Sequence, residues 1–144
     1  MSDMISDIEA GAAYIPYGYQ TPDFPSLKWP SGPQMQTQFY LYHRYDIWQF
    51  TLYWTLILFG VAHAAAGTWA ALMNRRLKAG LIIAVYLFVG MIEAVISASI
   101  IGAILGLIYT AGSFPMSTWI PFIWAVIQLL TMIMISYSMS SVVM

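Results

Sequence analysis

Two ionisable side chains, Glu93 and His63, stand inside long apolar stretches where they could do chemistry. If these stretches are antiparallel helices, Glu93 lies about 22 Å and His63 about 18 Å from their shared connection, so the two side chains could meet. An ionised carboxylate is costly in hydrocarbon, so Glu93 must face protein or a wet cavity, find a partner, or stay protonated. Two interpretations stay open: a proton relay or a site for a polar head group or amine, and a neutral hydrogen-bonded structural pair extended by Ser97.

Other chemistry finds little support in the residues. Gln128, within the last apolar stretch, joins Glu93, His63 and Ser97 as a candidate residue of this polar site, and a hydrogen bond to a neighbouring helix is its default use. The sequence holds no cysteine, which excludes disulfides, thiolate nucleophiles and cysteine-ligated metals. It also lacks a glycine-rich phosphate loop, a nucleophile elbow, paired intramembrane carboxylates and a cluster of residues at metal-ligand spacing. We therefore expect no enzymatic activity, no catalytic residues, no cofactor and no metal.

The composition indicates the kind of protein that positions these side chains. Of 144 residues, 60% are apolar and only 8% are charged, and the mean hydropathy is +0.73. A soluble domain carries about 25% charged residues. The sequence therefore predicts an integral membrane protein, and the absence of a basic face argues against a nucleic-acid partner.

The order of apolar stretches predicts an all-α membrane protein with three transmembrane helices and an irregular N-terminal tail. The tail, residues 1–45, is rich in proline and tyrosine, and the transmembrane domain covers residues 46–144 with spans at about 48–73, 79–109 and 119–140. Two re-entrant segments with one span are the alternative. The second span exceeds a hydrocarbon core of about 30 Å, so it must tilt, bend or protrude. Asp46 and Gln49 have capping-box spacing, and Ser117 or Thr118 could cap the third helix.

Charge in the connections predicts the orientation. The first connection holds Arg75, Arg76 and Lys78, whereas the second, residues 110–118, holds no charge. Basic loops stay on the cytosolic side, so we expect this loop and the C-terminus in the cytosol and the tail on the other side. These three residues could also attract anionic lipid.

Small residues recur at every fourth position of the second span, at Gly90, Ala94, Ala98, Gly102 and Gly106. Such a ridge lets another helix approach closely. It predicts tight packing of the first two spans, with homodimerisation or a partner's helix as alternatives. Aromatic side chains at the tail side of the spans predict an interfacial belt, formed by Trp48, Tyr53, Trp54, Tyr109, Trp119 and Trp124.

Several strings resemble the transmembrane protein 170 family, most of all its fungal members. They are FTLYWTLI at 50–57, His63, GTWA at 67–70, EAVIS at 93–97, and MSTWIPF at 116–122 followed by Trp124 and Gln128. The resemblance covers the three spans, about 48–140, and not the tail. It implies a multi-pass protein of the endoplasmic reticulum and nuclear envelope with a lumenal N-terminus, and it brings no catalytic residues.

The resemblance further implies non-enzymatic roles and partners. One role is that of a membrane subunit of a large bridge-like lipid-transfer protein, helping lipid leave the bilayer; the other is the shaping of reticulum sheets. A small proton-coupled carrier or a permease regulator is the remaining alternative. We expect membrane lipids and the lipid-transfer protein as partners, with a homo-oligomer also open.

Overall fold

Three long helices make up most of the computed structural model, which describes residue 15 and residues 18–27, 40–73 and 79–143. They are α2 (Arg44–Met73), α3 (Ala79–Ala111) and α4 (Trp119–Val143). Each is long and apolar enough to cross a membrane. The prediction of an all-α, three-helix membrane protein is confirmed, and the helices extend a few residues beyond the expected spans.

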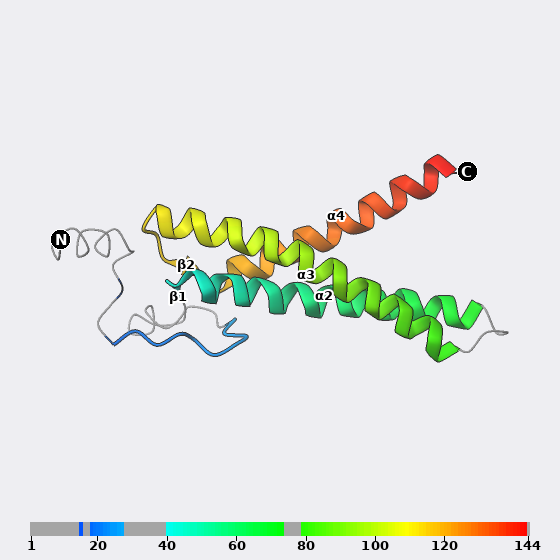
Figure 1. Cartoon of the computed structure of the whole chain (residues 1–144), viewed down its shortest axis with the longest axis horizontal. Helices are drawn as coiled ribbons and strands as arrows, with labels where there is room; N and C mark the ends of the chain where they lie inside the picture. Colours follow the sequence, from blue (N-terminus) through cyan, green and yellow to red (C-terminus); the bar gives the residue numbers. More distant parts are fainter. Residues whose placement is uncertain (1–14, 16–17, 28–39, 74–78, 144) are drawn as a thin grey trace.

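Helices α2 and α3 run antiparallel along their whole length, and α4 crosses them at an angle (Figure 1). The ridge of small residues on α3 is buried and faces α2, because a Cβ built on Gly102 would lie 3.1 Å from the Cα of Trp48, and one on Gly106 would lie 2.8 Å from the Cγ of Arg44. The absent Cβ atoms allow this close approach. The ridge is therefore covered within the chain.

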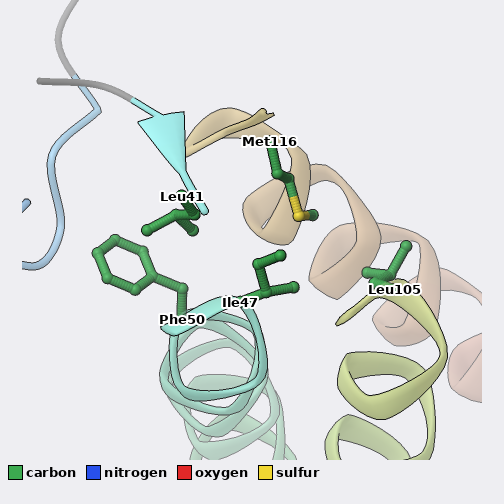
Figure 2. Close-up of a cluster of buried hydrophobic side chains, with 5 residues drawn as sticks. All are labelled: Leu41, Ile47, Phe50, Leu105 and Met116. Carbon is green, nitrogen blue, oxygen red and sulfur yellow. The ribbon is translucent and has the colours of Figure 1, made fainter. Parts of the chain in front are cut away.

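A short sheet lies at the end of the bundle nearest the tail, here called the tail end. It joins the segment before α2 to the segment before α4. Strand β1 (Tyr40–Leu41) pairs antiparallel with β2 (Met116–Ser117), which places Leu41 opposite Met116. Beneath the sheet lies a buried cluster drawn in Figure 2, formed by Leu41, Ile47, Phe50, Leu105 and Met116. Neither strand is predicted from the sequence, since two residues are too few to show an alternating pattern.

Part of the tail folds back onto this end. The Phe24 ring lies 5.5, 5.3 and 5.1 Å from the rings of Phe50, Tyr53 and Trp54. The Tyr19 hydroxyl donates a hydrogen bond of 2.9 Å to the backbone oxygen of Tyr40. Burial raises the pKa of Tyr19 above its usual 10.0, and the negative charge of Asp46 raises it further. These contacts hold residues 18–27 against the helices.

The expected capping box of α2 is wrong. The helix begins at Arg44, so Asp46 lies within its first turn, and the buried Asp46 carboxylate accepts a hydrogen bond of 2.7 Å from the Thr21 hydroxyl. Gln49 instead donates to the Tyr53 hydroxyl. A tail residue thus binds Asp46.

At α4 the structure decides between the two proposed caps. The Ser117 hydroxyl accepts from the backbone N–H of Trp119 at 3.4 Å. The buried Thr118 hydroxyl donates to the backbone oxygen of Ser26 at 3.0 Å. Ser117 therefore caps the helix, whereas Thr118 ties the tail to it.

A second set of aromatic side chains lies toward the opposite end, called the loop end because α2 and α3 are connected there. Trp69, Tyr86 and Tyr137 are exposed on the three helices. By helical rise they lie about 32, 35 and 27 Å from Trp48, Tyr109 and Trp119 at the tail end. The two sets of aromatic side chains thus lie about one hydrocarbon thickness apart, the separation expected of two interfacial belts.

Candidate functional site

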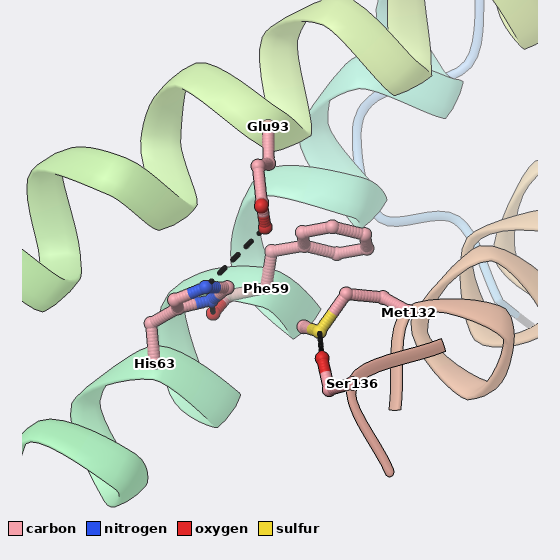
Figure 3. Close-up of polar contacts among 5 residues, drawn as sticks. All are labelled: Phe59, His63, Glu93, Met132 and Ser136. Atoms are coloured by element: carbon pink, nitrogen blue, oxygen red, sulfur yellow. Dashed lines mark hydrogen bonds and ion pairs between the residues drawn. The ribbon is translucent and has the colours of Figure 1, made fainter. Parts of the chain in front are cut away.

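A polar pair joins α2 to α3 inside the span. His63 Nε2 lies 3.4 Å from Glu93 Oε2, and the side chains of His63 and Glu93 are 12% and 48% exposed. His63 Nδ1 lies 2.9 Å from the backbone oxygen of Phe59 (Figure 3). The structure therefore brings together the two side chains that the depth argument predicts to be neighbours.

The contact to Phe59 fixes how protons are shared in this pair. A carbonyl oxygen only accepts, so Nδ1 must carry a proton and donate it. Nε2 then either donates to an ionised Glu93 or accepts from a protonated one, and one proton lies between the two groups in both cases. The pair is neutral overall, which suits its position in an apolar helix pair.

Gly90 makes room for the histidine. A Cβ built on Gly90 would lie 2.4 Å from Cγ and 2.9 Å from Cβ of His63. Both atoms are near the start of the side chain, so they cannot move aside without displacing the ring. The small-residue ridge therefore also positions the polar pair.

A second polar contact joins α3 to α4. The Ser97 hydroxyl, one helical turn from Glu93, donates to Oε1 of Gln128. Gln128 is only 9% exposed, and its amide nitrogen Nε2 is buried with no acceptor among the described residues. A buried amide donor without an acceptor is rare in proteins, so Nε2 needs an explanation.

The three polar residues Glu93, Ser97 and Gln128 line one cavity between α3 and α4. Its volume is about 570 Å³, and it opens to the surface of the bundle. Its other lining residues are mostly apolar: Phe59, Ile96, Ile101, Trp124, Ile127, Thr131, Met132, Ile135 and Ser136. His63 lies behind Glu93 and is not among the lining residues. An apolar cavity with a few polar groups is typical of a ligand site.

The cavity exists because α4 separates from the other helices. Its first turns lie beside α2 at the tail end, and its C-terminal half leads away from α2 and α3 (Figure 1). The side chains of Met132 and Ser136, 3.9 Å apart, stand on the α4 side of the space that Glu93 and Phe59 border on the other (Figure 3). The cavity is therefore bordered by α4 on one side and by α2 and α3 on the other.

Sequence reasoning named Gln128 as a site residue but missed Met132 and Ser136, which continue this wall on α4. Gln128, Met132 and Ser136 follow one another at intervals of four, which places them on one helix face. That spacing was a readable signal. The three loop residues Arg75, Arg76 and Lys78 lie outside the described residues.

The described part of the chain gathers no group of three His, Asp or Glu side chains that could hold a metal ion. What the arrangement can do is hold an amphiphilic molecule. Apolar walls would contact hydrocarbon, Glu93 could pair with a cation, and the amide of Gln128 could donate to an acceptor.

Comparisons with known proteins agree with the resemblance read from the strings. Residues 40–143, from β1 to the end of α4, match the family described as Transmembrane protein 170A/B-like. The chain is 43% identical over 132 residues to a Saccharomyces cerevisiae protein called Uncharacterized protein YPR153W, covering 90% of this chain and 94% of the yeast protein. No solved structure matches the chain. The match begins at the strand that joins the tail to the bundle and takes in every residue of the cavity, and the chain belongs to the transmembrane protein 170 family.

Proposed function

We propose that this chain is a non-enzymatic membrane protein of the endoplasmic reticulum that helps a lipid leave the bilayer, as a membrane subunit of a bridge-like lipid-transfer protein. The cavity between α3 and α4 carries the proposal. It lies between two helices that face lipid, and it combines apolar walls with Glu93, Ser97 and Gln128. A lipid could enter it sideways with its chains in contact with apolar side chains throughout.

Glu93 gives the cavity a carboxyl oxygen that can accept hydrogen bonds from a head group such as an ammonium. Its carboxylate is half exposed beside the cavity, and its partner His63 shares one proton with it. The ammonium of a phosphoethanolamine head group would pair with the carboxylate, as charge-assisted hydrogen bonds do. The head group would then replace part of the hydration that it loses on leaving the membrane surface.

The loop end offers a surface for the lipid-transfer protein. Beyond Tyr86, α3 continues for about 10 Å to Ala79, and past Trp69, α2 continues to Met73. Both extensions carry exposed apolar side chains, among them Leu72, Met73 and Leu81. Apolar side chains outside the hydrocarbon core would extend the path of an acyl chain into a partner's groove.

The charge pattern of the sequence supports a cytosolic loop end. Arg75, Arg76 and Lys78 in the connecting loop favour the cytosolic side and would attract acidic surfaces or anionic lipid, each with about 1 kcal/mol at the membrane. The tail end would then face the lumen. A cytosolic lipid-transfer protein could reach the apolar extensions from that side.

Affinity purification of the tagged chain in mild detergent, followed by mass spectrometry of partners and lipids, tests the proposal. We expect one very large lipid-transfer protein in near-equal amount and co-purifying phosphatidylethanolamine. Glu93→Gln should lower the bound lipid while the partner is retained. Ser138→Ala, at the C-terminal part of α4 beyond the cavity, is the matched control.

Three results would contradict the proposal. Recovery of the chain alone or as a homo-oligomer would favour a shaper of reticulum sheets. Proton-dependent uptake of a small solute by vesicles holding the chain would favour a carrier that uses the His63–Glu93 pair. Unchanged lipid content in Glu93→Gln would remove the head-group role of Glu93.

A further inference from the structure

We propose that Gln128 recognises the ester carbonyl of an acyl lipid bound in the cavity between α3 and α4. This inference rests on the proposed lipid-handling function and names the chemical group that the site detects. It makes Gln128 a specificity residue, distinct from the head-group role of Glu93.

The Gln128 amide has hydrogen-bonding capacity that the described residues leave unused. Ser97 donates its hydroxyl proton to Oε1 of Gln128, so the acceptor half of the amide is satisfied. The donor half, Nε2, is buried and has no acceptor within the described residues. Because Gln128 lines the cavity, a small adjustment of its amide that keeps the bond from Ser97 would present an N–H to a bound molecule. The ligand must therefore offer an acceptor.

The side chains around that amide are mostly apolar. On α4, Gln128 follows Trp124 and Ile127, and across the cavity lie Ile101 and Phe59. These apolar neighbours exclude a strongly hydrated acceptor such as a free phosphate, which would lose its water without a matching charge. An ester carbonyl is a neutral acceptor attached to a hydrocarbon chain, and it matches both the donor and the walls.

Gln128 also lies deep within the apolar part of α4. Gln128 lies nine residues from Trp119 and nine from Tyr137, about 14 Å from either aromatic belt by helical rise. Ester groups in an undisturbed leaflet lie at the edge of the hydrocarbon core of about 30 Å. A lipid whose carbonyl reaches Gln128 has therefore already lost its normal position in the leaflet. The amide would stabilise this displaced lipid, which the bilayer itself does not.

Paired lipids that differ only in this carbonyl test the inference. The purified full-length chain is titrated with diacyl phosphatidylethanolamine and with its dialkyl ether analogue, which replaces each ester carbonyl by a methylene. We expect the wild-type chain to bind the ester about fivefold more tightly, the effect of one hydrogen bond. In Gln128→Met, which keeps the length of the side chain and removes its amide, the two affinities should become equal.

Two further variants keep the test sharp. Thr131→Val changes another residue of the same cavity, whose hydroxyl donates within its own helix to the Ile127 oxygen, and it should retain the fivefold preference. Ser97→Ala releases the amide from its anchor and should reduce the preference even if Gln128→Met fails to fold. Thermal unfolding of each variant reports on the fold.

The outcomes separate this inference from the proposed function. Equal binding of ester and ether lipids by the wild-type chain, or a preference that persists in Gln128→Met, overturns the inference and leaves lipid handling intact. No binding of either lipid overturns the proposed function as well. The last comparison uses a diacylglycerol and its ether analogue, which carry no phosphate head group. The same fivefold preference for the ester would support recognition of the carbonyl. Equal binding of these two lipids would show that the carbonyl alone does not determine the preference, and would overturn the inference.

Discussion

The two ends of the helix bundle are built on different principles. At the tail end, three helices, a two-stranded sheet and residues 18–27 enclose a buried cluster of apolar side chains. Toward the loop end, α2 and α3 stay together while α4 leads away, and a cavity with polar groups lies between α3 and α4 (Figure 1). One end therefore fixes the helices, and the other is shaped to receive a molecule.

The difference shows how a small membrane protein can combine stability with access. The hydrophobic effect does not drive the association of helices in lipid, so packing and hydrogen bonds must hold them together. The contacts at the tail end hold the start of α4, while its C-terminal half leads away from α2 and α3. Changes at the tail end and along the ridge should then affect stability, whereas changes at the cavity should affect binding.

The largest effect is expected where α2 and α3 touch. In Gly102→Ile, the new side chain would begin 3.1 Å from the Trp48 backbone and force the two helices apart. We expect a loss of about 3 kcal/mol or more, with failure to fold as the extreme. Thermal unfolding in detergent measures it. Gly80→Ile is the control, because a Cβ there meets no atom within 4 Å; equal losses in both variants would contradict this account.

Gly90→Ala should disturb the polar pair more than the bundle. The added methyl would collide with the His63 ring and move it away from Glu93, with an expected loss of about 1–3 kcal/mol. Separated from His63, Glu93 should also bind ammonium lipids differently, so lipid content is the second measurement. Gly80→Ala serves as the control. A variant with unchanged stability and unchanged lipid would show that His63 has room to move.

At the tail end, Phe24→Ala should lower stability without affecting the cavity. The substitution removes ring contacts to Phe50, Tyr53 and Trp54, and aromatic pairs contribute about 0.5–1.5 kcal/mol each. We expect a loss of about 2 kcal/mol and normal lipid binding. Phe114→Ala, an exposed phenylalanine at the same end, should change little. If Phe24→Ala instead altered lipid binding, the two ends would not be independent.

The sequence predicts the helices and the polar pair better than the contacts that join distant segments. Helical geometry is local, so it can be applied directly to the sequence. It predicts the three apolar helices, the matching depths of His63 and Glu93, and the ridge formed by small residues at every fourth position from Gly90 to Gly106. The link from Thr118 to Ser26 joins residues 92 positions apart, and no periodicity announces such a contact. The divergence of α4 depends on how whole helices pack, so the cavity could not be predicted although several of its residues were.

The smallest expected effect concerns the attachment of the tail. Burial and the charge of Asp46 raise the pKa of Tyr19 above 10.0, so the folded chain favours the neutral phenol that donates to the Tyr40 oxygen. The stability gained this way is complete below pH 10 and is lost as the pH rises through the raised pKa.

Tyr19→Phe lacks the hydrogen bond and should cost about 0.5–1.5 kcal/mol near neutral pH. It should also abolish the alkaline loss, because phenylalanine does not ionise. Limited proteolysis of the tail between pH 8 and 11 measures both effects. A wild-type tail that is cut at the same rate over this range would mean that Tyr19 does not hold it, and that attachment of the tail depends on the contacts of Thr21, Phe24 and Thr118.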